Sequence, residues 1–178
     1  MSENKNHNAQ RMNIEAVKRI VSTVRTTLGP MGMDKMMVDG GGNVIVTNDG
    51  ATILRELDSA HPAAKMIVEV SKVQETNCYD GTTSSVVLAG QLLNNAESLF
   101  DKGLHPNVVN KGYSKARDMV QDILPNLVVD GDRQLQSIAK TAITGKSLET
   151  ADQKVAQLCV DTIKAVGAAS DVRVLAAP

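Results

Sequence analysis

The sequence predicts a mainly α fold, a helical bundle that carries one small β-hairpin. Apolar residues recur at spacings of three and four along most of the chain, which is the pattern of one buried helix face. The 42% hydrophobic content is almost wholly aliphatic, with eight Met, two Tyr, one Phe and no Trp. This composition favours packed helices over a sandwich or barrel. Only one pair of short β-prone runs stands out.

Length and charge limit the functional classes. The 178 residues suffice for one sizeable core, or a core with a small appendage. The net charge is −1 and the Lys and Arg residues are dispersed, so we expect no nucleic-acid partner. We also expect no membrane association and a cytoplasmic location, because no apolar run approaches about 20 residues and the start lacks a signal-peptide pattern.

The first elements are a helix and the hairpin. The polar, Asn-rich segment 1–11 is expected to be a flexible tail. The stripe Ile14, Val17, Val21, Val24 and Leu28 predicts a helix that ends at Gly29-Pro30. Two β-prone runs, 35–39 and 43–47, flank three glycines that accept positive φ and therefore predict a hairpin.

Six further helices are predicted from periodicity, prolines and turn residues. They cover 49–57, 62–73, 82–100, 106–123, 133–142 and 151–166. The helix over 82–100 is apolar around much of its circumference, so we expect it at the centre of the bundle, buried among the others. Asp130-Gly131 indicates a turn and a possible domain boundary.

The strongest local signal is Asp80-Gly81-Thr82-Thr83-Ser84-Ser85, at the start of the central helix. Backbone N–H groups and hydroxyls at a helix amino terminus bind phosphate. Asp80 could hold Mg²⁺, a cation that prefers one or two carboxylates with phosphate oxygens and water. The alternative is an Asp N-cap that contributes about 1 kcal/mol of helix stability. For the motif alone, the cap is the better interpretation.

Two other segments carry the same ambiguity. In Thr47-Asn48-Asp49-Gly50, Asp49 is either a helix cap or a carboxylate that orients an attacking water. Leu28-Gly29-Pro30 is either a routine helix stop or a turn that lets backbone approach a phosphate.

Several remaining features are weaker signals. Lys146 could reach a terminal phosphate from a loop, although most surface lysines do not. Cys78 and Cys159 lack metal-ligand spacing and are expected to be free thiols, with a disulfide left open. We interpret Met31, Met33, Met36 and Met37 as packing residues. Neither GxxxxGK[ST] nor GxGxxG occurs, which argues against a P-loop or Rossmann site.

Taken together and in order, these segments resemble the group II chaperonins of the archaeal thermosome type. The matching segments are 13–16, 24–39, 47–54, 80–83, 86–90 and 144–146, within a resemblance that runs from about residue 9 to residue 166. The resemblance implies an equatorial nucleotide-binding domain over 12–129, incomplete at its C-terminal side, and the start of an intermediate domain over 130–166. The tail 167–178 is atypical of the family.

The resemblance also implies ATP and Mg²⁺ as ligands, with a position for each candidate residue. Leu28, Gly29 and Pro30 would line the nucleotide and its inner phosphates, and Asp80 would bind Mg²⁺. The outer phosphates would be held by Gly81, Thr82, Thr83 and Ser84. Asp49 would position the hydrolytic water and Lys146 would sense the terminal phosphate. The hairpin would pair with a neighbouring chaperonin subunit.

Departures from the family pattern change these expectations. Family members are far longer and carry a second catalytic aspartate, so we expect nucleotide binding with slow or no hydrolysis, and clients reached only through full-length partners. Tyr79 replaces the usual Gly before Asp80 and could crowd the phosphate, and Met31 replaces a common basic residue. The alternatives are a nucleotide-independent module that joins or caps chaperonin rings, or a degenerate fragment that aggregates.

Overall fold

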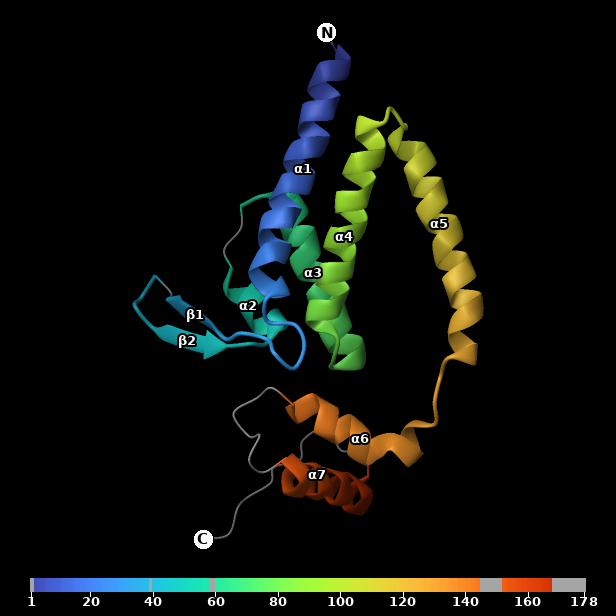
Figure 1. The fold of residues 1–178 in the computed structure, drawn as a ribbon. Helices are drawn as coiled ribbons and strands as arrows, with labels where there is room; N and C mark the ends of the chain where they lie inside the picture. Colours follow the sequence, from blue (N-terminus) through green and yellow to red (C-terminus); the bar gives the residue numbers. More distant parts are fainter. Residues whose placement is uncertain (1, 39, 58–59, 145–151, 168–178) are drawn as a thin grey trace. The chain divides into compact units, whose positions relative to one another are not determined.

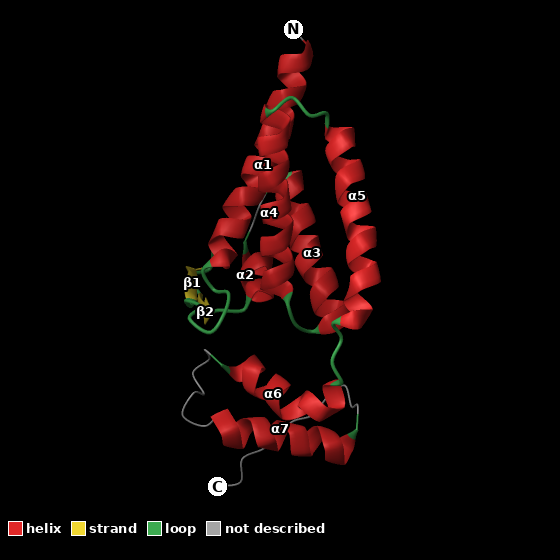
Figure 2. Cartoon of the chain, turned by 45° about the vertical axis from the view of Figure 1, so that its right-hand side comes forward, coloured by secondary structure: helices red, strands yellow, loops and turns green. Residues whose placement is uncertain are grey.

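The computed structural model describes residues 2–38, 40–57, 60–144 and 152–167 (Figure 1). The chain forms two compact units, Met1–Val120 and Gln121–Pro178. The elements are α1 Ser2–Arg25, β1 Lys35–Val38, β2 Val44–Thr47, α2 Gly50–Glu56, α3 Pro62–Cys78, α4 Thr82–Asp101, α5 Pro106–Ile123, η1 Leu124–Asn126, α6 Gly131–Ile143 and α7 Asp152–Val166. The predicted class, mainly helical with a small hairpin, is confirmed (Figure 2).

Helix α1 corrects one expectation. The helix begins at Ser2, so the segment 1–11, expected as a tail, is helical from its second residue. No Gly or Pro precedes Gly29, and therefore nothing in this segment breaks the helix. Arg11 also donates a hydrogen bond to the Asp101 carboxylate at the end of α4.

The core of the first unit lies where α1, α2, α3 and α4 meet. Its buried members are Val17, Ile20, Val21, Val24, Ile53, Leu54, Ala64, Ile67 and Val86. Each helix contributes one apolar stripe, as the spacing predicts. The sequence predicts that helix α4 is buried on all sides, and the described structure does not confirm this. The helix packs on α1 and α3, whereas Leu88 is 60% and Leu92 is 40% exposed.

The hairpin pairs β1 and β2 antiparallel, with Met37 opposite Ile45. Alternation along the strands turns Met37 toward the core. Met31, Met33 and Met36 are exposed. The interpretation of the four methionines as packing residues therefore holds for Met37 and is wrong for the other three.

The second unit contains η1 and the helix pair α6 and α7, which pack against each other. Asp130 caps α6 by accepting a hydrogen bond from the Asp132 N–H at 3.1 Å, so the predicted turn at Asp130-Gly131 opens this helix. Ala156 and Val160 of α7 are buried. Within the described ranges, no helix combines the length and apolar character needed to cross a bilayer.

A glycine pair tests the packing of α4 on α1. A Cβ at Gly90 would lie 2.6 Å from Val21 Cγ2, whereas a Cβ at Gly112 in α5 would meet no atom within 4 Å. Gly90→Ala is expected to destabilise the fold by about 1–3 kcal/mol, because Val21 is stiff and must shift. Gly112→Ala should stabilise it by up to about 1 kcal/mol. Urea unfolding followed by circular dichroism measures both, and equal effects would contradict the packing.

An ion pair between α1 and α4 gives a pH-dependent test. The Lys18 ammonium donates to the Glu97 carboxylate, and this hydrogen bond raises the pKa of Lys18, with the charges of Glu97 and Glu15 acting in the same direction. Because the folded pKa is the higher one, the stabilisation is complete below the unfolded value of about 10.4 and is lost as pH rises through the folded pKa.

Lys18→Met should therefore lower the free energy of unfolding by up to about 1 kcal/mol at pH 7 to 9. The difference from the unsubstituted protein should shrink above about pH 10.5. Lys72→Met is the matched control, because Lys72 pairs with Glu69 one turn away on the exposed side of the same helix. Thermal unfolding across this pH range measures both variants, and a difference independent of pH would contradict the assignment.

Candidate functional site

The turn after α1 is closed by backbone hydrogen bonds. The Gly32 N–H donates to the Gly29 carbonyl at 3.0 Å, and the Met33 N–H donates to the Thr26 carbonyl at 2.8 Å. Gly29 adopts φ +86°, a left-handed conformation that favours glycine. Leu28 is 45% exposed. The predicted segment Leu28-Gly29-Pro30 is therefore a fixed, solvent-facing turn.

Asp49 is the N-cap of α2. Its Oδ2 accepts from the Thr52 N–H at 2.9 Å and from the Thr52 hydroxyl at 2.7 Å. Its own N–H donates to the Thr47 hydroxyl at 3.1 Å. The cap interpretation is thus correct for Asp49, and it leaves Oδ1 without a hydrogen bond from the described residues.

Asp80 lies between two left-handed residues. Tyr79 has φ +56° and ends α3, and Gly81 has φ +74° and precedes α4. The Gly81 N–H donates to Asp80 Oδ1 at 2.7 Å. The N-cap position belongs to Gly81, where no side chain makes a cap hydrogen bond. The cap interpretation is therefore wrong for Asp80.

This arrangement leaves the amino end of α4 open for an anion. The N–H groups of Thr82, Thr83 and Ser84 belong to the first turn, where no acceptor exists within the helix. The partial positive charge of the helix end adds to their attraction for anions. Thr82 is buried and Ser84 is exposed, so the turn is anchored on one side and faces solvent on the other.

A close contact joins the Asp49 and Asp80 loops. Gly50 is buried, and a Cβ built there would lie 3.1 Å from Thr83 Cβ and 3.3 Å from Thr83 Cα. The first residues of α2 and α4 therefore touch. Figures 1 and 2 show the carboxyl end of α1 at the same end of the bundle.

The other predicted residues are less closely joined. No hydrogen bond in the described structure links the turn at Leu28-Gly29-Pro30 to either carboxylate loop. Lys146 lies outside the described residues, in the second unit. The structure thus unites Asp49 with residues 80–84 and leaves the placement of Lys146 as a prediction.

The donor set suits a magnesium phosphate more than a bare metal ion. Asp49 and Asp80 are exposed, and neither forms an ion pair with a Lys, Arg or His side chain of the described residues. Among the described residues, no three His, Cys, Asp or Glu side chains gather to hold a metal. Mg²⁺ commonly takes one or two carboxylates and completes its shell with phosphate oxygens and water. Asp80 beside the open end of α4 offers that combination.

Tyr79 does not fill this opening. The residue is 87% exposed, so it does not pack into the helix end, and its effect on an approaching phosphate stays a prediction. Its backbone N–H donates to the Glu75 carbonyl at 3.0 Å, which closes the last turn of α3. The consequence of having Tyr at this position is backbone strain, because a left-handed conformation costs a non-glycine residue about 1–2 kcal/mol.

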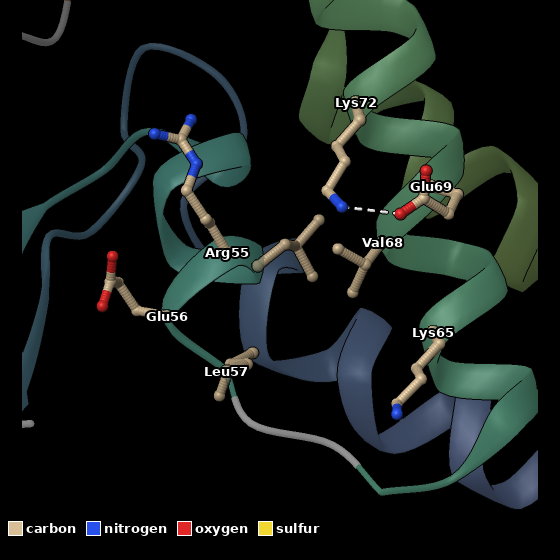
Figure 3. A pocket seen from close by; sticks show the side chains of 8 residues that line it. Arg55, Glu56, Leu57, Lys65, Val68, Glu69 and Lys72 are labelled. Carbon is tan, nitrogen blue, oxygen red and sulfur yellow. Dashed lines mark hydrogen bonds and ion pairs between the residues drawn. The ribbon is translucent and has the colours of Figure 1, made fainter. Parts of the chain in front are cut away.

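A separate cavity of about 470 Å³ lies between α2 and α3 (Figure 3). It is lined by Leu54, Arg55, Glu56, Leu57, Lys65, Val68, Glu69 and Lys72. Its charges are of both signs, and Lys72 Nζ donates to Glu69 at 2.6 Å on its α3 side. None of the predicted site residues lines it, so it is distinct from the carboxylate loops.

Sequence reasoning missed two features that shape the site. The first is the contact between Gly50 and Thr83, which joins residues far apart in the chain. The second is Gln74 in α3, whose Nε2 donates to the Asp80 carbonyl at 2.8 Å. A lone glutamine within a helix carries no sequence signal of this contact.

Comparison with known proteins identifies relatives along most of the chain. The profile of the TCP-1/cpn60 chaperonin family matches residues 20–176. A thermosome subunit of Methanopyrus kandleri is 52% identical over 167 residues, which is 92% of this chain and 31% of that protein. Thermosome subunit beta of Methanothermobacter thermautotrophicus is 52% identical over 160 residues, covering 89% of this chain and 30% of the relative. The chain thus spans under a third of these relatives' length.

The strained residue before Asp80 gives a stability test. Tyr79→Gly should stabilise the protein by about 1 kcal/mol, because glycine accepts φ +56° without a Cβ penalty. Gly81→Ala is the opposite case, since its φ is +74° and an added Cβ would lie 3.3 Å from Gln74 Nε2. We expect it to destabilise by a similar amount. Denaturant midpoints measure both, and a loss of stability in Tyr79→Gly would contradict the strain.

Proposed function

Because the chain belongs to the TCP-1/cpn60 chaperonin family, we propose that it binds ATP with Mg²⁺ at the open end of α4. The observation that carries this proposal is the pairing of Asp80 with a helix end that no side chain caps. Gly81 occupies the N-cap position, so the first-turn amides are available to phosphate oxygens.

The proposed ligand contacts follow from the donors at this end of the bundle. Gly81, Thr82, Thr83 and Ser84 would bind the outer phosphates through N–H groups and hydroxyls. Asp80 would hold Mg²⁺ through Oδ2, since Oδ1 already accepts from Gly81. Bound Mg²⁺ would neutralise phosphate charge and fix the polyphosphate between the two carboxylate loops.

The remaining assignments rest on the resemblance and on position. Leu28, Gly29 and Pro30 would face the nucleotide and its inner phosphates from the closed turn after α1. Asp49 would orient a water toward the terminal phosphate through Oδ1, while Oδ2 stays with Thr52. Lys146 would approach the terminal phosphate from the intermediate domain that we propose for 130–166.

The wider function that we propose is protein folding in an assembly of chaperonin subunits. The relatives are thermosome subunits, and client proteins would be handled through partner subunits. The hairpin supports a contact with another subunit. Its exposed Met36, Val38, Val44 and Val46 form an apolar surface on a short two-stranded sheet whose outer edges are unpaired in the described structure.

The same hairpin supports a second candidate function. Its apolar surface needs no nucleotide to bind a partner strand, so the chain could instead join or cap chaperonin rings independently of ATP. Association with full-length thermosome subunits that is equal with and without ATP, together with no nucleotide binding by the chain alone, would select this candidate.

Asp80→Asn tests the nucleotide site. Isothermal titration with ATP and Mg²⁺ should detect binding by the unsubstituted chain, and Asp80→Asn should weaken it about tenfold or more, because the metal loses its charged protein ligand. Asp122→Asn on the exposed side of α5 is the matched control and should bind normally. A folded sample that releases no heat, or equal affinity in Asp80→Asn, would remove the proposal.

A further inference from the structure

Gln74 is the side chain that holds the Asp80 peptide. It lies in α3, six residues before Asp80, and is partly buried. Its Nε2 donates to the Asp80 carbonyl at 2.8 Å. No other described group donates to that carbonyl. The Gln74 amide also packs against Gly81, because a Cβ built on Gly81 would lie 3.3 Å from Gln74 Nε2.

The loop needs such a hold because its backbone is unusual. Asp80 stands between left-handed Tyr79 and Gly81, so small rotations of either residue would redirect the Asp80 carboxylate. The helix-terminal hydrogen bonds, from Tyr79 N–H to the Glu75 carbonyl and from Ser85 N–H to the Gly81 carbonyl, fix the two ends of the loop. Within the loop, the Gly81 N–H donates to Asp80 Oδ1. Among the described residues, the Gln74 amide is the group from outside the loop that holds its middle.

The turn of α3 that carries Gln74 is itself attached to α2. Arg55 Nη2 of α2 donates to Glu75 Oε1 at 3.3 Å, and α2 begins directly after Asp49. Gln74 therefore connects the Asp80 loop to the helix that starts at the other carboxylate loop. The Gly50 and Thr83 contact provides a second connection.

We infer that Gln74 is a positioning residue for the Mg²⁺ ligand Asp80, acting through the Asp80 backbone. This inference rests on the proposed function. A neutral amide suits the position because it donates a hydrogen bond without placing a positive charge where the metal must bind. Gln74 itself touches neither metal nor nucleotide.

Gln74→Leu tests the inference, because leucine keeps a similar size and removes the donor. Titration of ATP at fixed Mg²⁺ concentrations should show a Kd increased about three- to tenfold and a higher Mg²⁺ concentration for half-saturation. Nucleotide binding in EDTA should be unchanged, which a merely structural defect would not produce. Gln91→Leu is the matched control, since Gln91 pairs with Asn95 on the exposed side of α4.

A second variant covers the case in which leucine disturbs folding. Gln74→Glu keeps the shape and helix propensity but replaces the donor with an acceptor that faces the Asp80 carbonyl. It should raise the half-saturating Mg²⁺ concentration at least as much as Gln74→Leu. If the unsubstituted chain binds Mg²⁺-ATP and both folded variants show the same Mg²⁺ dependence, the inference is overturned while the proposed function stands. If the unsubstituted chain does not bind, both fall.

Discussion

The close approach of Gly50 to Thr83 is the constraint on which the site depends. A side chain at Gly50 would occupy the space of the Thr83 side chain, so only glycine lets α2 and α4 begin against each other. That contact is possible because Ile53, Leu54 and Val86 are buried together in the core directly beneath it. Apolar packing therefore fixes the spacing of the two helix starts, and the helix starts fix the two carboxylate loops.

Asp49 and Asp80 each lie just before the start of a helix, but their carboxylates accept different hydrogen bonds. Asp49 caps its helix with Oδ2, which fixes the carboxylate, and no described residue donates a hydrogen bond to Oδ1. Asp80 is released from capping because Gly81 enters the left-handed region and takes the N-cap position. One carboxylate is thus fixed by α2, while the other depends on its own loop for orientation. The Asp80 loop is also the one that receives a side-chain hydrogen bond from a neighbouring helix, from Gln74 to the Asp80 carbonyl.

The periodic part of the fold could be predicted from the sequence. The stripe from Ile14 to Leu28 and the prolines at 62 and 106 identify helices because they report burial on one face and a fixed φ at the first turn. The hairpin followed from two β-prone runs around glycines. The start of α1 was missed because a polar helix has no apolar stripe to reveal it. The exposure of Leu88 and Leu92 was missed because periodicity reports an apolar face, not the partner that covers it.

The candidate site was predictable only as a set of segments. Asp49 and residues 80–84 could be named from local chemistry, yet local chemistry favoured a cap at both positions, and the structure shows a cap at one. The feature that decides against a cap at Asp80 is the left-handed conformation of both Tyr79 and Gly81. The sequence does not predict it, because Tyr rarely adopts positive φ. Gln74 and Thr83 act through tertiary contacts, and such contacts become visible only when α3 and α4 are placed side by side. Order along the chain therefore names the residues that we propose for the ligand, whereas three-dimensional packing identifies which residues hold them in place.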